Sequence, residues 1–360
     1  MPQSTIPFMQ LRGGSSKGLY FKASDLPTDP VQRDRVLLAA MGGVGPDDPR
    51  QIDGLGGGHP LTSKIAIVAA STRPDADLDY EFVQVVVGAN RTDGTQNCGN
   101  ILAGVVPFAI EAGLLPATTG ETKARVFLVN SDSRCEVVVQ TPDGRVTYDG
   151  DVAIDGVPGT AAPVMCLYSN LTGSACGDLF PTGNLLDEIA GVEVTCIDNG
   201  MPVVLLRATD FGLTGYETTD ALNANAELKN RLETVRLAAG PLMQLGDVAA
   251  KVVPKMTLIA PPLQGGVVHT RTFIPHVCHA AIGVLGAVSV ATAAAIPGTV
   301  ATGIAVPPAD ENGYSVEHPS GEFSVTLEID RSHDRPNVRR AGLLRTARLL
   351  SRGEVIIPSS

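Results

Sequence analysis

The sequence predicts an α+β protein of two similar domains, each with mixed β-strands wrapped around a central apolar helix. The length of 360 residues is typical of two domains of ordinary size. Short apolar runs such as VQVVVGA, ARVFLVN and CEVVVQT are separated by Gly, Pro and Asp, which favours a β meander over regular βαβ alternation. Two longer segments are apolar nearly all round, as expected of helices surrounded by protein.

The two apolar segments define the central helices. We expect one helix from residue 100 to residue 112 and the other from residue 279 to residue 296. Cys98 and Cys278 each stand just before one of them, and they are 180 residues apart (278 − 98). The second segment approaches the length of a membrane span. It is rich in Ala and Gly and lacks flanking Trp or Tyr, so we interpret it as a buried helix.

A second match supports an internal duplication. KASDL at residues 22–26 resembles RATDF at residues 207–211, at an offset of 185 (207 − 22). Two matches at similar offsets are typical of a repeated unit with a small change in length. The sequence therefore predicts domains at 1–184 and 185–360, and the terminal strand is able to return to the first domain.

The duplication also predicts where a ligand binds. In the register of the second match, residues 14–16 fall opposite residues 199–201. Two similar domains form a cleft, and clefts between domains are preferred ligand sites. If both central helices point their N-termini into the cleft, their free N–H groups form a double anion receptor.

Composition excludes several classes of partner. The formal net charge of −11 disfavours nucleic acid and anionic membranes, so an anionic substrate has to be attracted by local donors. The six cysteines form no CxxC pair and no tight pattern with the six histidines, which predicts neither a disulfide framework nor a metal site. The N-terminus lacks a basic segment followed by an apolar stretch, so we expect a cytoplasmic protein.

Cys98 is the first candidate for chemistry. A thiol at a helix N-terminus is stabilised as the thiolate, which is the reactive form. Gly99 lets the backbone approach a ligand closely, and Asn100 adds an amide donor. The structural alternative is a small buried hydrophobic residue, as many free cysteines are. The polar context TQN before Cys98 favours the functional interpretation.

Lys64 is the second candidate. It follows the Gly-rich loop GLGGGHPLTS and begins the apolar run IAIVAA, whose alternation places Lys64 and Ala66 on one face of a strand and Ser63 and Ile65 on the other. Partial desolvation at this position favours the neutral amine that a base requires. The alternatives are a lysine that snorkels at a strand edge and a Schiff-base lysine for pyridoxal phosphate. No further pattern supports that cofactor.

Two further groups of polar residues can bind an anion. The loop of residues 12–18 holds Ser15, Ser16 and Lys17 among glycines, and a hairpin turn is its structural alternative. It is not a P-loop, because the Walker spacing is absent. In RTFIPHVCHAAIG, Arg271 can clamp a carboxylate. Cys278 and His279 occupy the position in the repeat that corresponds to Cys98, where His279 can donate to a carboxylate or act as an acid.

Taken together, the motifs RGGSSKG, GGGHPLTSK, NCGN, DNGMP and RTARLLSRGEVIIP resemble the PrpF-like branch of the diaminopimelate epimerase superfamily. The resemblance covers nearly the whole chain. It implies a diaminopimelate epimerase-like fold of two pseudo-symmetric domains with the active site between them. It also implies proton transfer on carbon, without cofactor or metal, in small di- and tricarboxylates.

The resemblance also implies roles for residues. In the PrpF-like branch a lysine and the first-domain cysteine are catalytic, which indicates Lys64 and Cys98. Epimerases of the superfamily use two cysteines. Cys278 leaves that mechanism open, although His279 follows it where the epimerases have Gly. The residues expected to bind substrate are Ser15, Ser16, Lys17, Ser63, Gly99, Asn100, Met201, Arg271, Cys278 and His279.

The segment FIPHVCHAAIGVLGAVSVATAAAIPGTV is most similar to members of the branch that act in bacterial gallate degradation. This implies keto–enol tautomerisation of 4-oxalomesaconate in aromatic catabolism. Alternatives are a 4-oxalomesaconate Δ-isomerase, a 2-methylaconitate cis–trans isomerase, a two-cysteine epimerase or racemase, and a carboxylate-binding protein without turnover. The expected partner is a small tricarboxylate, and association into a homo-oligomer is compatible with the sequence.

Overall fold

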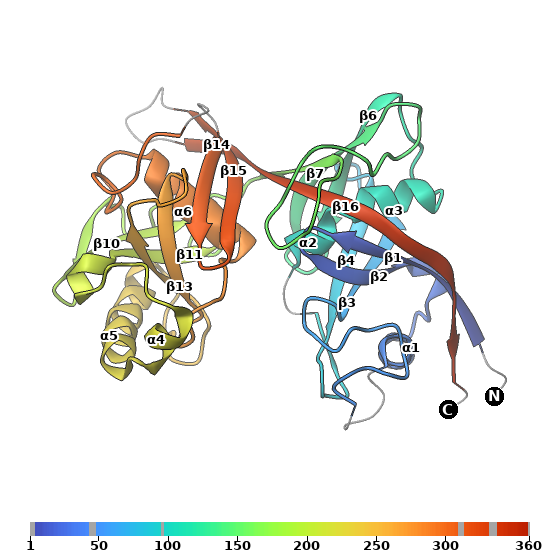
Figure 1. Ribbon diagram of the computed structural model, residues 1–360, viewed down its shortest axis with the longest axis horizontal. Helices are drawn as coiled ribbons and strands as arrows, with labels where there is room; N and C mark the ends of the chain where they lie inside the picture. The colour runs from blue at the N-terminus through green and yellow to red at the C-terminus, as the bar shows by residue number, and fades with distance from the viewer. Residues whose placement is uncertain (1–3, 43–47, 95–96, 309–312, 331–336, 359–360) are drawn as a thin grey trace. The chain divides into compact units, whose positions relative to one another are not determined.

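The computed structural model describes residues 4–42, 48–94, 97–308, 313–330 and 337–358 (Figure 1). The chain forms two compact units. Unit 1 comprises residues 1–167 and 344–360, and unit 2 comprises residues 168–343. The C-terminal strand therefore belongs in part to unit 1. The repeat places the second domain at 185–360, and that boundary of the duplicated sequence stays a prediction.

The strands of unit 1 form a sheet that closes on itself. The order is β1-β2-β3-β4-β6-β7-β8-β16, and β1 also pairs with β16, which closes it. The short strand β5 pairs with β4. The strands are β1 (Ser4–Gly13), β2 (Ser16–Lys22), β3 (Lys64–Ala70), β4 (Leu78–Val85), β5 (Thr92–Asp93), β6 (Gly120–Leu128), β7 (Ser133–Thr141), β8 (Pro163–Ser169) and β16 (Asn337–Ile357). The helices are η1 (Ala23–Asp25), α1 (Pro30–Met41), α2 (Gly99–Leu102) and α3 (Val105–Glu111).

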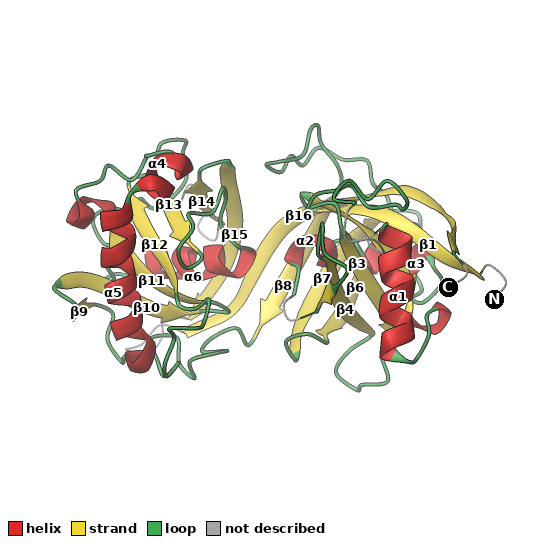
Figure 2. Ribbon diagram, turned by 90° about the horizontal axis from the view of Figure 1, so that it is seen from below, coloured by secondary structure: helices red, strands yellow, loops and turns green. Residues whose placement is uncertain are grey.

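Unit 2 repeats this arrangement with a longer helical crossover. Its strand order is β16-β15-β14-β13-β12-β11-β10-β9. The strands other than β16 are β9 (Asp187–Ile189), β10 (Val192–Asp198), β11 (Pro202–Arg207), β12 (Lys255–Ala260), β13 (Val268–Phe273), β14 (Gly313–His318) and β15 (Gly321–Asp330). The helices are η2 (Ala208–Phe211), α4 (Thr219–Ala224), α5 (Ala226–Leu242) and α6 (Val284–Ala295), with α5 running along the strands (Figure 2).

The two units share a strand register that agrees with the sequence repeat. In each unit an antiparallel hairpin is followed by a helical crossover and a strand parallel to the second strand of the hairpin. Gly18 pairs with Lys64 in unit 1, and Val203 pairs with Lys255 in unit 2. The partners on the hairpin strands are 185 residues apart (203 − 18), which is the offset of the second sequence match.

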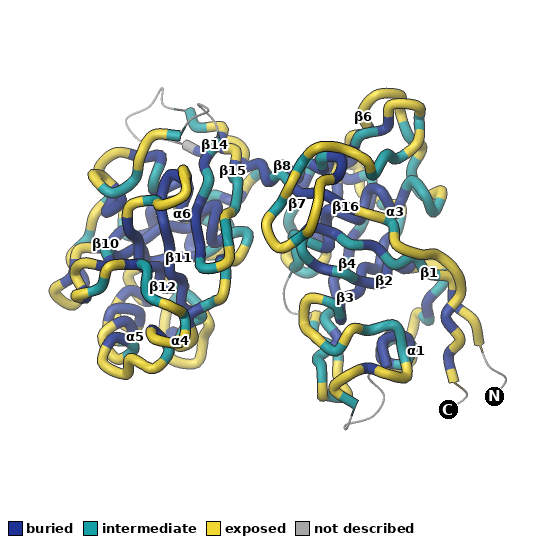
Figure 3. Tube along the Cα trace, viewed as in Figure 1, coloured by how far each residue is buried: buried dark blue, intermediate teal, exposed yellow. Residues whose placement is uncertain are grey.

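Each unit has a core on either side of its strands. In unit 1, Ile65 and Ile67 of β3 belong to the cluster that includes residues of α1, whereas α2 contacts β1, β2 and β3. In unit 2, Met256 and Leu258 of β12 belong to the cluster that includes residues of α5, whereas α6 contacts β10, β11, β14 and β15. The buried trace of α6 is visible in Figure 3. Of the described helices, none combines the length and hydrophobicity that a membrane crossing requires.

The first central helix is interrupted between α2 and α3, so the prediction of one continuous helix over residues 100–112 is wrong. The N–H groups of Ala103 and Gly104 donate to the carbonyls of Asn100 and Ile101, three residues back. Tyr20 Oη also donates to Ile101 O at 2.7 Å. A β-carbon at Gly104 would lie 2.3 Å from Tyr20 Oη. The tyrosine therefore occupies the space at the break, and its hydroxyl donates to a carbonyl of the helix.

The second central helix begins later than predicted. Its N-cap is Gly283 and its first residue is Val284, so the expectation that Cys278 directly precedes a helix is wrong. Cys278 forms an antiparallel bridge with Phe273, and the His279 N–H donates to Thr272 O at 2.8 Å. These bonds keep residues 278 and 279 extended beside β13, and the helix can start only after the chain leaves the strand.

Arg236 of α5 ties the crossover of unit 2 together. Its side chain is fully buried, and its Nε and Nη2 donate to the Glu233 carboxylate at 2.7 and 2.8 Å. Its Nη1 donates to the carbonyls of Val248, Lys251 and Val253. These three carbonyls belong to the segment that leads into β12. The guanidinium therefore replaces water for a stretch of backbone that has no partner strand.

Arg236→Met should remove this anchor, so that Glu233 and the carbonyls of Lys251 and Val253 lose the arginine as donor, while Val248 O still accepts from Lys251 N. Leaving buried carbonyl acceptors without a donor costs about 1–3 kcal/mol of the free energy of unfolding, whereas water can reach the partly exposed Glu233 carboxylate. Urea unfolding followed by circular dichroism measures the change. Arg231→Met is the matched control on the same helix, because Arg231 is exposed and donates to one carbonyl, Asp210 O. Equal stability of the two variants would contradict the assignment.

Candidate active site

Lys64 is the first residue of β3 and is buried, with 9% of the residue exposed. It pairs with Gly18 of β2 on one side and Gln84 of β4 on the other. Its Nζ donates to Gln84 Oε1 at 2.8 Å and lies 5.0 Å from the centre of the Phe82 ring. The amine is thus held by an amide and an aromatic face, and no carboxylate pairs with it among the described residues.

Gln84 is itself fixed by the loop that precedes Lys64. Its Nε2 donates to Ser63 O at 2.9 Å and to Val85 O at 3.1 Å. Ser63 is fully buried, and its Oγ donates to Gln51 Oε1 at 2.6 Å and to His59 O at 2.9 Å. The Ser63 hydroxyl therefore holds the Gly-rich loop in place. A role of Ser63 in substrate binding stays a prediction, and the anchoring residue Gln51 carried no motif in the sequence.

Cys98 is the N-cap of α2, with extended backbone angles of φ −127° and ψ 103°. Its carbonyl accepts from Leu102 N at 3.0 Å and from Tyr80 Oη at 3.2 Å. Cys98 is partly exposed, whereas the other five cysteines are buried free thiols. The structure thus presents one thiol of the six to a ligand. The helix that follows has only four residues, too few for a strong helix dipole at Cys98.

The loop of Gly13–Ser16 contacts α2 closely. Asn100 Nδ2 donates to Ser15 Oγ at 3.2 Å. Gly14 has a φ of +52°, and a β-carbon there would lie 2.1 Å from Asn100 Oδ1. Ser16 has 2% of its surface exposed, and its Oγ is a buried hydroxyl with no hydrogen-bond partner among the described residues. An unpartnered buried hydroxyl is costly, so a ligand atom is a suitable partner for it.

These residues share one face of unit 1. Gly13 pairs with Ser16, and Gly18, two residues along β2, pairs with Lys64. Paired residues project on the same face of a sheet and alternate residues return to it, so Ser16 and Lys64 share a face. Tyr20 and Tyr80 also belong to this face, and their hydroxyls bond to α2 and to Cys98 O. The structure therefore brings together Ser15, Ser16, Lys64, Cys98, Gly99 and Asn100. The backbone N–H of Lys17 donates to Leu61 O at 2.8 Å, which joins β2 to the loop that precedes Lys64.

In unit 2, Arg271 is a buried member of a polar chain. Its Nε donates to Glu217 O at 2.8 Å, and its Nη1 donates to Thr270 O and contacts His269 Nε2. His269 Nδ1 in turn lies 2.9 Å from Glu317 Oε2. Burial lowers the pKa of Arg271 below its usual value. This arrangement fixes the guanidinium firmly, and the role of Arg271 as a carboxylate clamp stays a prediction.

Cys278 is buried in unit 2, and its predicted role in substrate binding stays a prediction. Its side chain belongs to the hydrophobic cluster beside α5, together with Phe273. Burial raises the pKa of its thiol to about 11. Its N–H donates to Asn223 Oδ1 at 2.7 Å. The thiol donates to His279 O at 3.9 Å, and its raised pKa favours the protonated form, which weighs against a mechanism with two reactive cysteines.

His279 and Met201 lie at other points of unit 2. His279 Nδ1 accepts from Ala281 N at 2.8 Å, and burial lowers the pKa of its imidazole. Met201 O accepts from Ser289 Oγ of α6 at 2.7 Å, and Asn199 Nδ2 donates to Thr292 Oγ1 of the same helix at 2.8 Å. The DNGMP loop is therefore tied to α6. Substrate binding by His279 and Met201 stays a prediction.

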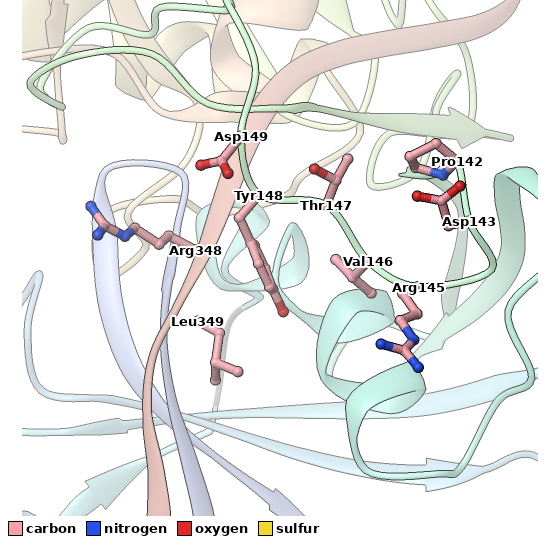
Figure 4. Close-up of a pocket in the computed structure, with 9 residues that line it drawn as sticks. All are labelled: Pro142, Asp143, Arg145, Val146, Thr147, Tyr148, Asp149, Arg348 and Leu349. Carbon is pink, nitrogen blue, oxygen red and sulfur yellow. The ribbon is translucent and has the colours of Figure 1, made fainter.

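A pocket of about 700 Å³ lies elsewhere in unit 1. Its lining residues are Pro142, Asp143, Arg145, Val146, Thr147, Tyr148, Asp149, Arg348 and Leu349 (Figure 4). The side chains of Arg145 and Arg348 lie on opposite sides of Tyr148, so they do not converge on one ligand. The lining includes neither Lys64 nor Cys98. No group of three His, Cys, Asp or Glu side chains suited to a metal occurs in the described part of the chain.

Known proteins resemble the chain along its whole length. The family model described as PrpF protein matches residues 3–358. The (4E)-oxalomesaconate Delta-isomerase of Novosphingobium sp. strain KA1 is 55% identical over 354 residues, which are 98% of each chain. The 4-oxalomesaconate tautomerase of Pseudomonas putida KT2440 is 54% identical over 358 residues, which are 99% of this chain and 97% of the relative.

Solved structures support the same relationship. The structure of methylitaconate-delta-isomerase matches with a TM-score of 0.89 and 33% identity, over 99% of this chain and 96% of that one. A hydroxyproline epimerase from Agrobacterium vitis matches with a TM-score of 0.52 and 12% identity, over 98% and 93% of the two chains. The second likeness concerns the fold alone. Together these likenesses confirm the predicted epimerase-like α+β fold.

The exposure of the thiols predicts a selective chemical reaction. In the native protein, a thiol reagent such as 5,5′-dithiobis(2-nitrobenzoate) should modify Cys98 rapidly and leave the five buried thiols unmodified. Mass spectrometry of peptides after labelling identifies the residue. All six cysteines should react once the protein is unfolded in guanidinium. Rapid native labelling that persists in a Cys98→Ser variant would contradict the described burial.

Proposed function

The chain belongs to the PrpF protein family, and on this premise we propose that it is an isomerase that interconverts the keto and enol forms of 4-oxalomesaconate. The reaction is a proton transfer at a carbon next to a carbonyl and uses side chains of the protein without a cofactor. Two relatives that are 54–55% identical over nearly their whole length carry names for reactions of this substrate. The observation that carries the mechanism is the position of Lys64 on the face of unit 1 that α2 covers.

Lys64 is the base in this mechanism. Its amine contacts Gln84 Oε1 and the Phe82 ring. Neither group is a carboxylate, so the amine is not held in an ion pair. The lone pair of the neutral amine takes the proton from the carbon next to the substrate carbonyl, and the C–H electron pair becomes the C=C bond of the enolate. The C=O π electrons move onto the oxygen, and the Cys98 thiol delivers a proton to that oxygen, which completes the enol and leaves a thiolate that regains a proton from solvent. The protonated lysine returns its proton in the reverse direction.

Cys98 is the partner acid or base, and its thiol is the partly exposed one of the six. The enolate oxygen and the carboxylates need donors that are already oriented. Ser16 Oγ, which lacks a partner among the described residues, and Asn100 Nδ2, which lies 3.2 Å from Ser15 Oγ, can supply them. Lys17 belongs to the same loop. We assign this loop to binding a substrate carboxylate.

The proposal also includes the cellular setting. All six cysteines are free thiols, as in proteins of reducing compartments, and we place the enzyme in the cytoplasm. Its partner is the small tricarboxylate itself. Local hydrogen-bond donors have to attract the carboxylate groups of this substrate, because the net charge of −11 on the protein repels an anion.

A Lys64→Met variant tests the assignment of the base. Methionine keeps the length and the apolar stem of the side chain and removes the proton acceptor. The variant should lose about 10²- to 10⁴-fold in kcat, the usual contribution of a positioned acid–base group. The matched control is Lys123→Met, because Lys123 is exposed on β6. Near-normal turnover by the Lys64 variant, with an unchanged circular dichroism spectrum, would overturn the assignment.

A second candidate function is allylic isomerisation of the same substrate. It is favoured by the relative named (4E)-oxalomesaconate Delta-isomerase, at 55% identity. The first step is the same, but the proton then arrives at a distant carbon, and the double bond moves. We expect proton NMR of the product to show the enol tautomer formed without a shifted double bond. A product with a new C–H group at the distant carbon would instead assign the isomerase.

A further inference from the structure

A second lysine occupies the position of Lys64 in the other unit. Lys255 is the first residue of β12, as Lys64 is the first residue of β3. Each of these strands follows a helical crossover and lies parallel to the second strand of a hairpin. The hairpin residues opposite the two lysines, Gly18 and Val203, are 185 residues apart (203 − 18). The two lysines are therefore equivalent positions of the repeat, although no local motif marks Lys255 in the sequence.

Lys255 also lies on the equivalent face of the strands. Met256 and Leu258 belong to the hydrophobic cluster beside α5, so the alternate residues Lys255 and Thr257 project on the other face. Thr257 Oγ1 lies 3.0 Å from Thr272 Oγ1 across the strand pair. The His279 N–H donates to Thr272 O at 2.8 Å, so His279 lies beside this pair of threonines. The described face of unit 2 is thus polar at this point.

The ammonium group of Lys255 has no counter-ion in the described part of the chain. The residue is partly buried, and neither an ion pair nor a hydrogen bond of its Nζ occurs there. Burial, together with the positive charge of Arg236, lowers the pKa of Lys255 to about 8. Lys255 in turn contributes to the lowered pKa of His279, after the effect of burial. The charge that acts on Lys255 is thus that of Arg236, whose own carboxylate partner is Glu233. A partly buried cation without a counter-ion of its own is stabilised when an anion binds.

The protein maintains this position with a dedicated anchor. The segment before Lys255 is held by Arg236, whose Nη1 donates to the carbonyls of Val248 and Val253. The loop before Lys64 is held in the same way by Gln51, whose Oε1 accepts from Gly58 N and Ser63 Oγ. In each unit, a buried polar side chain thus fixes the segment that precedes the strand beginning with the lysine. Such anchoring is expected where a side chain has to be presented in one position.

One difference separates the two lysines. Lys64 Nζ is bonded to Gln84 Oε1 at 2.8 Å. No such amide bond holds Lys255 Nζ among the described residues, and threonines occupy the neighbouring positions on its face. The amine of Lys255 is therefore available to a ligand oxygen.

We propose that Lys255 binds a carboxylate of the substrate in unit 2, as the counterpart in the repeat of the catalytic Lys64. The identity of the ligand as a tricarboxylate rests on the proposed function. The existence of an anion site at Lys255 rests on the register, the face of the strand and the missing counter-ion. Lys255 is thus a substrate-binding residue that the sequence motifs do not include.

Binding of tricarballylate, propane-1,2,3-tricarboxylate, tests the site without any turnover, because this molecule has no ketone. Isothermal titration calorimetry should show a Kd raised about tenfold or more by Lys255→Met, since a charge-assisted hydrogen bond is lost. Lys255→Arg should keep the affinity within about threefold of the unmodified protein. The matched control is Lys251→Met, an exposed lysine of the same segment whose Nζ donates to Leu245 O.

Steady-state kinetics with 4-oxalomesaconate supply the second measurement. The Lys255→Met variant should raise KM about tenfold and change kcat by less than about threefold, as expected for a group that binds the substrate and the transition state alike. The inference is overturned if Lys255→Met binds tricarballylate as the unmodified protein does, or if the unmodified protein does not bind it. If binding depends on Lys255 but 4-oxalomesaconate is not turned over, the proposed function fails and the anion site stands.

Discussion

Helix α2 packs closely against β1, β2 and β3 because the residues at the contact are glycines, and a side chain there would not fit. A β-carbon on Gly13 would lie 2.4 Å from Asn100 O, and one on Gly18 would lie 2.5 Å from Lys64 O and 3.1 Å from Ile101 Cδ1. Because two of these atoms are backbone oxygens, the neighbours cannot move aside cheaply. The glycines therefore set how near the helix that begins after Cys98 comes to the strand that begins at Lys64. The positions of Ser16 and Asn100 follow from the same contact.

Much of this could be predicted from the sequence, because the signals were local or periodic. The alternation after the Gly-rich loop placed Lys64 and Ala66 on one face, and the pairing of β3 with β2 and β4 agrees with it. The register of the repeat agrees with the pairing of Val203 with Lys255. The partial exposure of Cys98 also fits its polar context. The two long apolar runs located both central helices to within about five residues.

The errors and omissions concern long-range contacts. The break in the first central helix depends on Tyr20, which is 81 residues from Ile101 in the chain, and the late start of α6 depends on a bridge between Phe273 and Cys278. Gln51, Arg236 and Lys255 are single polar residues without a motif. Their roles emerge only when the fold brings their partners together or aligns the two units by strand register. Apolar patterns carry no information about such contacts.

We propose that this protein moves a proton on a carbon of 4-oxalomesaconate with its own side chains. The most direct measurement is proton NMR and mass spectrometry of 4-oxalomesaconate incubated with the unmodified enzyme in deuterated water. We expect solvent deuterium to enter the carbon next to the carbonyl as the two tautomers interconvert. Tight binding of the substrate with no deuterium in either tautomer would contradict it.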